Sequence, residues 1–129
     1  MKLKQDDELA KQSNVQESMV SASDAEACPM VSFVQLISGK WAIPILYRLI
    51  VIDAPVRFSS LQRAVSPITQ KELTRQLRSF EQRNLVKRTV YPEVPPRVEY
   101  EITALGKTLR PTLDSLACWM KNNKRYLER

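Results

Sequence analysis

Polar side chains repeat at helical spacing in the middle of the chain, and their types suit contacts with nucleic acid. Lys71, Arg75 and Arg78 are cations that can bind phosphates. Gln70 and Thr74, together with Arg75, can form hydrogen bonds with the edges of bases. A basic amphipathic helix without such a role would simply face water. The segments that follow this one favour the DNA-binding interpretation.

The sequence around these side chains predicts a helix over residues 69–82. Thr69 and Glu72 have the spacing of a capping box, in which each side chain satisfies the other's free backbone N–H. Ile68 and Leu73 are placed to form a hydrophobic staple. The apolar face has the i, i+4, i+7 spacing of a helix and carries Leu73, Leu77 and Phe80. The polar side chains therefore project from the opposite face.

The composition excludes several kinds of catalytic site. The 129 residues are enough for one domain with a core, but they include no histidine. Histidine triads and histidine-ligated metals are therefore impossible. Cys28 and Cys118 are too few and too far apart for a zinc site, and two glycines cannot form a glycine-rich phosphate loop. We expect no enzyme, no metal and no cofactor.

The positive charge is concentrated in one part of the chain. The net charge is +6, with a pI near 9.5. Residues 1–27 hold three basic and six acidic residues, whereas residues 57–100 hold nine basic and four acidic ones. A basic segment of this kind is typical of a surface that faces a polyanion.

Neither an export signal nor a membrane span is expected. Residues 1–27 are acidic and lack an apolar core, so we interpret them as a flexible tail, with a fraying helix near residues 6–17. The longest apolar stretch, residues 41–52, contains Pro44 and Arg48 and is shorter than the roughly 20 residues of a spanning helix. We expect a cytoplasmic protein with no membrane partner.

Two apolar helices are predicted before the basic segment. Pro29 suits the first position of a short, largely buried helix, which Gly39 would end. Residues 40–52 are apolar on nearly all sides, so this helix should be central to the core. Pro44 is tolerated only near a helix start and therefore fixes where the second helix begins.

The basic segment has the layout of a helix-turn-helix. Arg57-Phe58 is predicted as a very short strand, after which Ser59 caps a third helix. Ser66-Pro67 breaks that helix, and the helix over residues 69–82 starts directly afterwards. Two short helices joined by a short break form this motif, although many other helical proteins contain such pairs.

A β-hairpin is predicted next. Residues 86–90 and 98–102 alternate with period two, which is typical of half-buried strands. The proline-rich segment 92–96 suits the tip of the hairpin. A helix-turn-helix followed by a hairpin is a winged helix, and positive charge is placed on this wing by Lys87, Arg88 and Arg97.

A long helix over residues 104–125 is predicted to close the domain, with a kink at Pro111. Its apolar stripe is formed by Leu105, Leu109, Leu113, Leu116 and Met120, with Trp119 beside it. This stripe is longer than a winged-helix core needs. The surplus predicts a partner surface, most simply a second copy of the chain.

Several motifs resemble those of the HxlR-type winged helix-turn-helix transcriptional regulators of bacteria, which are related to the MarR group. The motifs are S-G-K-W at residues 38–41, R-F-S-x-L at 57–61, T-Q-K-x-L-T-x-Q-L-R at 69–78, L-V-x-R at 85–88, Y-P-x-V-P-P-R-V-E-Y at 91–100 and T-x-L-G at 103–106. The resemblance covers residues 28–122. This chain departs from the family at Ser38, where many relatives carry glycine, and at Pro44, where a leucine-rich run is usual.

The resemblance implies a fold that is mainly α with a small β-hairpin, in one domain over residues 28–125 with N- and C-terminal dimerisation helices. It also implies a homodimer that binds double-stranded operator DNA as an inverted repeat, through a recognition helix over residues 69–82 and a wing over residues 85–103. The residues expected to contact DNA are Ser59, Arg63, Thr69, Gln70, Lys71, Thr74, Arg75, Arg78, Lys87 and Arg97. The dimer interface is expected from Leu109, Leu113, Leu116, Trp119 and Met120.

Two cysteines are candidates for redox sensing. Many HxlR-type proteins carry a cysteine just before the first helix, as Cys28 is here, and in some members it senses oxidants or electrophiles. The unpaired N–H groups at a helix start favour a thiolate, although Cys28 could equally be a small apolar residue that seals the helix. Cys118 lies opposite the apolar stripe, and a disulfide between Cys28 and the partner's Cys118 is one version of the hypothesis.

Two alternatives stay open at this point. A winged helix can serve as a protein-interaction module without sequence-specific DNA binding. A thiol-based redox enzyme is disfavoured, because there is no C-x-x-C pair. The sequence names no operator, no small-molecule effector and no direction of regulation.

Overall fold

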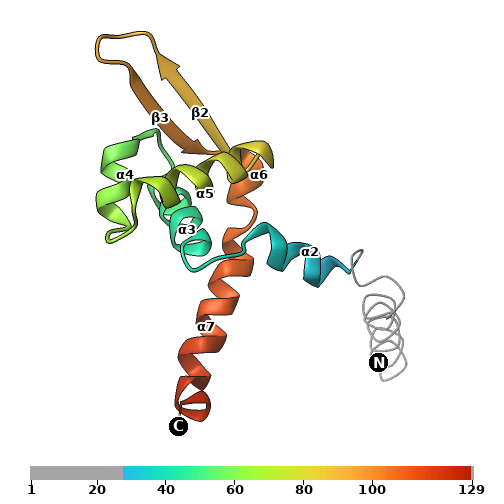
Figure 1. Cartoon of the computed structure of the whole chain (residues 1–129). Coiled ribbons are helices and arrows are strands. Elements are labelled where there is room, and N and C mark those ends of the chain that lie inside the picture. Colours follow the sequence, from blue (N-terminus) through green and yellow to red (C-terminus); the bar gives the residue numbers. More distant parts are fainter. Residues whose placement is uncertain (1–27, 129) are drawn as a thin grey trace. The chain divides into compact units, whose positions relative to one another are not determined.

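The computed structural model describes residues 28–128, and the expected acidic tail over residues 1–27, with its helix, lies outside them. The chain divides into two units, residues 1–38 and residues 39–129. The elements carry the labels of Figure 1. Within the described range, no helix is both long and apolar enough to cross a membrane.

The first unit contributes one described helix, α2 (Pro29–Leu36). Pro29 occupies its first turn, as expected. The helix ends at Leu36, before Gly39, which has a positive φ of 105°. The expectation that α2 is largely buried is wrong, because none of its residues is buried and Met30 is 66% exposed. Burial of an apolar helix requires a packing partner, and periodicity alone does not supply one.

The core of the second unit is built on α3 (Ala42–Ile52). The helix starts at Ala42, two residues later than predicted, and Pro44 lies in its first turn as expected, because a proline there removes no intrahelical hydrogen bond. One face of α3 is fully buried and consists of Ala42, Ile45, Leu46, Leu49 and Ile50. Asp53, in the left-handed conformation, ends it.

The helix-turn-helix consists of α4 (Phe58–Ala64) and α5 (Gln70–Gln82). The short strand before it, β1 (Val56–Arg57), lies one residue earlier than predicted. Helix α4 starts at Phe58 with Arg57 as its N-cap, so Ser59 does not cap it. The bounds predicted for this strand and helix are wrong because the sheet holds Arg57 in an extended conformation opposite Glu99.

The wing is the hairpin of β2 (Val86–Tyr91) and β3 (Arg97–Ile102), which projects beyond α4 and α5 in Figure 1. Strand β1 adds to β3, so the sheet is antiparallel in the order β1-β3-β2. The period-two prediction for the hairpin is confirmed. Together with the helix-turn-helix, it makes the fold a winged helix.

The predicted last helix is two helices, α6 (Ala104–Lys107) and α7 (Arg110–Leu127). Pro111 lies in the first turn of α7 and does not kink a continuous helix, because proline is accommodated at a helix start. Helix α7 is tied to α3 by the hydroxyl of Tyr47, which donates to Asp114 Oδ1 at 2.6 Å. Figure 1 shows α7 extending away from the wing.

Candidate nucleic-acid interface

Helix α5 separates a buried face from an exposed one. The predicted apolar residues Leu73, Leu77 and Phe80 are buried, together with Gln76. At the helix start, Thr69 Oγ1 accepts a hydrogen bond from the backbone N–H of Glu72 at 3.1 Å. The capping box is only half formed, because the Glu72 carboxylate accepts hydrogen bonds from Arg75 and Gln76.

The exposed face of α5 lines an open groove. Six of the ten residues expected to contact DNA line it, namely Thr69, Gln70, Lys71, Thr74, Arg75 and Arg78. Ser79 and Gln82 complete the lining and were not predicted as contacts. The Thr74 hydroxyl donates to the Gln70 carbonyl at 2.8 Å, which leaves its oxygen as an acceptor. The groove therefore presents cations and hydrogen-bonding groups on one surface.

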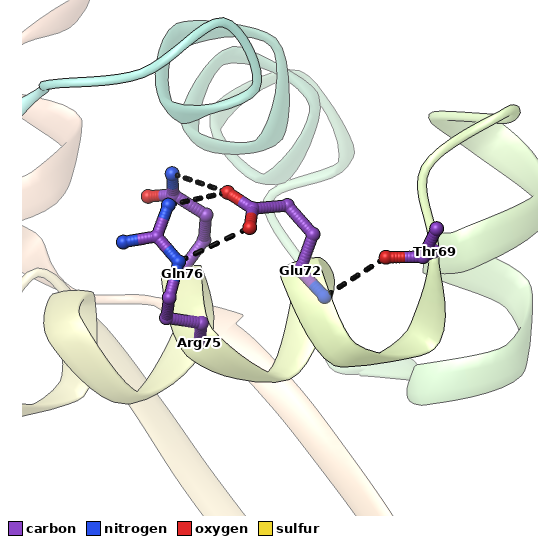
Figure 2. Close-up of polar contacts among 4 residues, drawn as sticks. All are labelled: Thr69, Glu72, Arg75 and Gln76. Carbon is purple, nitrogen blue, oxygen red and sulfur yellow. Dashed lines mark hydrogen bonds and ion pairs between the residues drawn. The ribbon is translucent and has the colours of Figure 1, made fainter.

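A polar cluster fixes the position of Arg75 (Figure 2). Arg75 Nε donates to Glu72 Oε2 at 3.1 Å, and Gln76 Nε2 donates to Glu72 Oε1 at 3.2 Å. The hydrogen bond from Arg75 lowers the pKa of Glu72, and the same bond raises the pKa of Arg75. Both side chains thus stay ionised, while Arg75 remains 64% exposed. The spacing i, i+3 could have signalled this pair.

The start of α4 and the tip of the wing form a second cleft. It is lined by Arg57, Phe58 and Ser59 from the start of α4 and by residues 93–98 from the wing. Ser59 is exposed there, as a DNA contact requires. Arg63 is exposed on α4, and its Nη2 donates to Ser60 Oγ at 3.4 Å. Arg57 was not predicted as a DNA contact. Its place in this cleft follows from the pairing of β1 with β3.

Arg97 lies within the wing itself. Its guanidinium stacks on the Tyr91 ring at 4.1 Å and pairs with Glu93 at 3.3 Å. Its Nε is buried without a hydrogen-bond partner within the described residues. Tyr91 and Arg97 are also opposite each other in the sheet. The Arg97 side chain is therefore engaged in contacts within the wing tip.

Neighbouring cations on β2 point to opposite faces of the hairpin. Arg88 lies opposite the buried Tyr100, and it lines a cleft beside α5. Lys87 lies opposite Glu101 on the other face. Sequence reasoning selected Lys87 and left out Arg88. The alternation that places Arg88 on the face of Val86 was the signal that could have found it.

The two cysteines are free and lie on different helices. Cys28 is the half-buried N-cap of α2, and Cys118 is exposed on α7. Asn122 Nδ2 donates to Cys118 Sγ at 3.5 Å. The second unit contains Cys118 and the first contains Cys28.

The apolar stripe of the last helices is mostly exposed. Leu113 alone is buried among the residues of α7, at 3% exposure. Leu116, Trp119 and Met120 are about half exposed, and Leu109 is half-buried. Leu105 lies on the separate helix α6 and is exposed, so it is not part of a continuous stripe. Among residues 28–128, the core thus uses Leu113 and leaves the side chains of the next turn about half exposed.

Comparison with known proteins adds independent information. Residues 36–128 match the family model described as HxlR-like helix-turn-helix. The uncharacterized HTH-type transcriptional regulator YdeP of Bacillus subtilis is 38% identical over 109 residues, which span 84% of each chain.

Two solved structures are also similar. The redox regulator HypR in its reduced form has a TM-score of 0.68 and 38% identity, covering 77% of this chain and 96% of that one. The diamide-treated YodB from B. subtilis has a TM-score of 0.61 and 31% identity, covering 74% of this chain and 93% of that one.

Proposed function

The chain belongs to the HxlR-like family of helix-turn-helix transcriptional regulators, and on this premise we propose that it binds an inverted-repeat operator as a homodimer, without catalysing a reaction. Family membership makes it a regulator of the helix-turn-helix type. The operator, the homodimer and the control by thiols are the further parts of the proposal.

The exposed face of α5 carries this proposal. Its groove joins Lys71 and Arg78, which can bind phosphates, to Gln70 and Arg75, which can read base edges. The side chains share one helix face of the width that enters a major groove. The wing beside it can then approach the neighbouring minor groove. Arg97 would act by holding the wing tip in shape through Tyr91.

The uncovered part of α7 supports the homodimer. Leu116, Trp119 and Met120 form an apolar surface on a helix that extends away from the wing. A two-fold interface there would cover the same surface on both copies. Two copies related in this way would read inverted half-sites about one helical turn apart, roughly 34–36 Å.

Redox control is a second component, and free cysteines favour it. HypR is known as a redox regulator, and YodB has been crystallised after diamide treatment. In this chain, Cys28 lies at the start of α2 and Cys118 is exposed on α7. Oxidation of Cys28, alone or with the partner's Cys118, would change how the two copies present their recognition helices.

Selection from a random pool of duplex DNA tests the proposal. The full chain should enrich one inverted repeat, and its binding should weaken steeply with salt. Repeating the selection after diamide treatment tests thiol control in the same material. A chain that enriches no sequence over random DNA would instead fit a protein-interaction module built on a winged helix.

A further inference from the structure

A small cleft separates α5 from the base of the hairpin. It has a volume of about 250 Å³ and is lined by Thr74, Arg78, Glu81, Arg88 and Tyr100. Thr74 and Arg78 also line the groove on the exposed face of α5. The cleft is therefore continuous with the candidate DNA surface.

The strand register explains why Arg88 reaches this cleft. Val86 and Tyr100 are buried, and Arg88 lies directly opposite Tyr100. Side chains of a strand alternate between its faces, so Arg88 shares the inner face with Val86. Lys87, opposite Glu101, projects from the outer face.

The two arginines of the cleft differ from Arg75 and Arg97 in their ion pairing. Arg75 is paired with Glu72, and Arg97 with Glu93. Arg78 and Arg88 form no ion pair within residues 28–128. Glu81 is the one carboxylate that lines the cleft, so two guanidinium groups face one negative charge. An anion between them would be bound by charge-assisted hydrogen bonds.

We propose that this cleft holds one phosphate of the DNA backbone, with Arg78 and Arg88 as its ligands, and that Arg88 is a DNA-binding residue. The inference rests on the proposed function. In a duplex, each sugar-phosphate strand separates the major groove from the neighbouring minor groove. A protein that places α5 in the major groove and the hairpin at the minor groove must straddle that strand. The strand then runs over the space between α5 and the hairpin, where Arg78 and Arg88 lie.

The test measures affinity for the selected operator and for a random duplex over a range of KCl concentrations. Arg88→Ala should weaken both complexes on the order of tenfold for each subunit, and it should lower the salt slope by about two phosphates per dimer, one for each subunit. Arg48→Ala removes an exposed arginine from α3 and is the matched control, with little effect expected on either quantity. Arg88→Lys should retain part of the affinity, because it keeps the charge but loses the forked geometry.

A gain in affinity provides a check that loss of folding cannot imitate. Glu81→Gln removes the negative charge of the cleft and should tighten binding to both duplexes. Replacing the contacted phosphate with a neutral methylphosphonate should weaken the wild-type complex more than it weakens the complex of Arg88→Ala, in which Arg78 is the one remaining ligand of the pair. That non-additivity would locate the phosphate at this residue.

Three results would overturn the inference. The first is an Arg88→Ala protein that binds both duplexes like wild type. The second is a Lys87→Ala protein that loses more affinity than Arg88→Ala, and the third is a Glu81→Gln protein that binds more weakly. Any of them, with a wild-type chain that still selects an operator, rejects the phosphate site alone. A wild-type chain without sequence selectivity rejects the proposed function itself.

Discussion

Glu72 and Arg75 form a two-point ion pair on α5, with Nε–Oε2 and Nη2–Oε1 distances of 3.1 and 2.5 Å. The pair uses one edge of the guanidinium and leaves its other N–H groups available. Solvent screens an exposed pair of this kind, so its contribution to stability is small. Its effect is on position, because it limits the orientations of a side chain that faces the groove.

Arg75→Ala should cost sequence selectivity more than it costs affinity for random DNA. A bidentate contact between arginine and guanine discriminates by on the order of tenfold to a hundredfold, so we expect that loss at one base pair in each half-site. The measurement is binding to the operator and to its single-base variants. An equal loss on every sequence would make Arg75 a phosphate contact. Glu72→Gln is the companion variant. We expect it to bind random DNA more tightly and to show a smaller difference in affinity between the operator and its single-base variants.

Leu116→Glu should give monomers that keep their fold. Leu116 is 49% exposed, so a charge there disturbs the proposed interface without entering the core. Leu113→Glu is not an equivalent test, since Leu113 is buried within one chain and a charge there would unfold it. Sedimentation measures the oligomeric state. The control is Lys121→Glu, which introduces a glutamate at another position on α7. A Leu116→Glu protein that still sediments as a dimer would exclude this surface.

Gly106→Ala should destabilise the fold by about 1–3 kcal/mol through overpacking. A Cβ at this position would lie 2.6 Å from the Leu85 carbonyl oxygen and 2.5 Å from Ile102 Cδ1. The Ile102 side chain can rotate, but the Leu85 carbonyl is fixed because it accepts hydrogen bonds from both the backbone and the hydroxyl of Thr103. Urea unfolding measures the loss. If adding Ile102→Val restored full stability, the carbonyl would not be the obstacle.

Local signals predicted much of the fold. The Thr69 cap depends on residues three apart, and the period-two strands of the hairpin depend on alternation. Pro44 fixed the start of α3 for the same reason, because its effect acts within one turn. Each of these features was therefore accessible from the sequence.

Features that depend on distant partners were not accessible in the same way. The exposure of α2 and the division of the last helix at Thr108 depend on what packs nearby, and spacing does not reveal this. The stacking of Arg97 on Tyr91 could be predicted only with knowledge of how β2 pairs with β3. The faces of β2 on which Lys87 and Arg88 lie were different, since the alternation of the strand already indicated them.

Arg97→Ala should weaken binding to all sequences while leaving the salt slope almost unchanged. The guanidinium is engaged by Glu93 and the Tyr91 ring, so its loss should act through the shape of the wing tip. Tyr91→Leu removes the stacking surface without removing a charge, and it should reproduce the effect. The same salt titration on both variants measures this. A salt slope that falls by about two per dimer, one for each subunit, in Arg97→Ala but not in Tyr91→Leu would make Arg97 a phosphate contact instead.

Cys28→Ser should bind the operator like wild type when reduced, but should no longer respond to diamide or quinones. Cys28 is the N-cap of α2, directly before Pro29, so an adduct or a disulfide there changes the start of that helix. Half-sites are read jointly, and a small change in the spacing of two recognition helices would misalign one of them. Operator binding before and after oxidation is the measurement.

Cys118→Ser separates the two versions of this redox hypothesis. Cys118 is exposed on α7, so it is accessible to oxidants and to a thiol of the partner chain. If Cys118→Ser also abolishes the response, together with a dimer band on non-reducing gels, the switch is an intersubunit disulfide. If Cys118→Ser responds like wild type, Cys28 acts alone through an adduct. A Cys28→Ser protein that still releases DNA on oxidation would leave Cys28 as a packing residue at the start of α2.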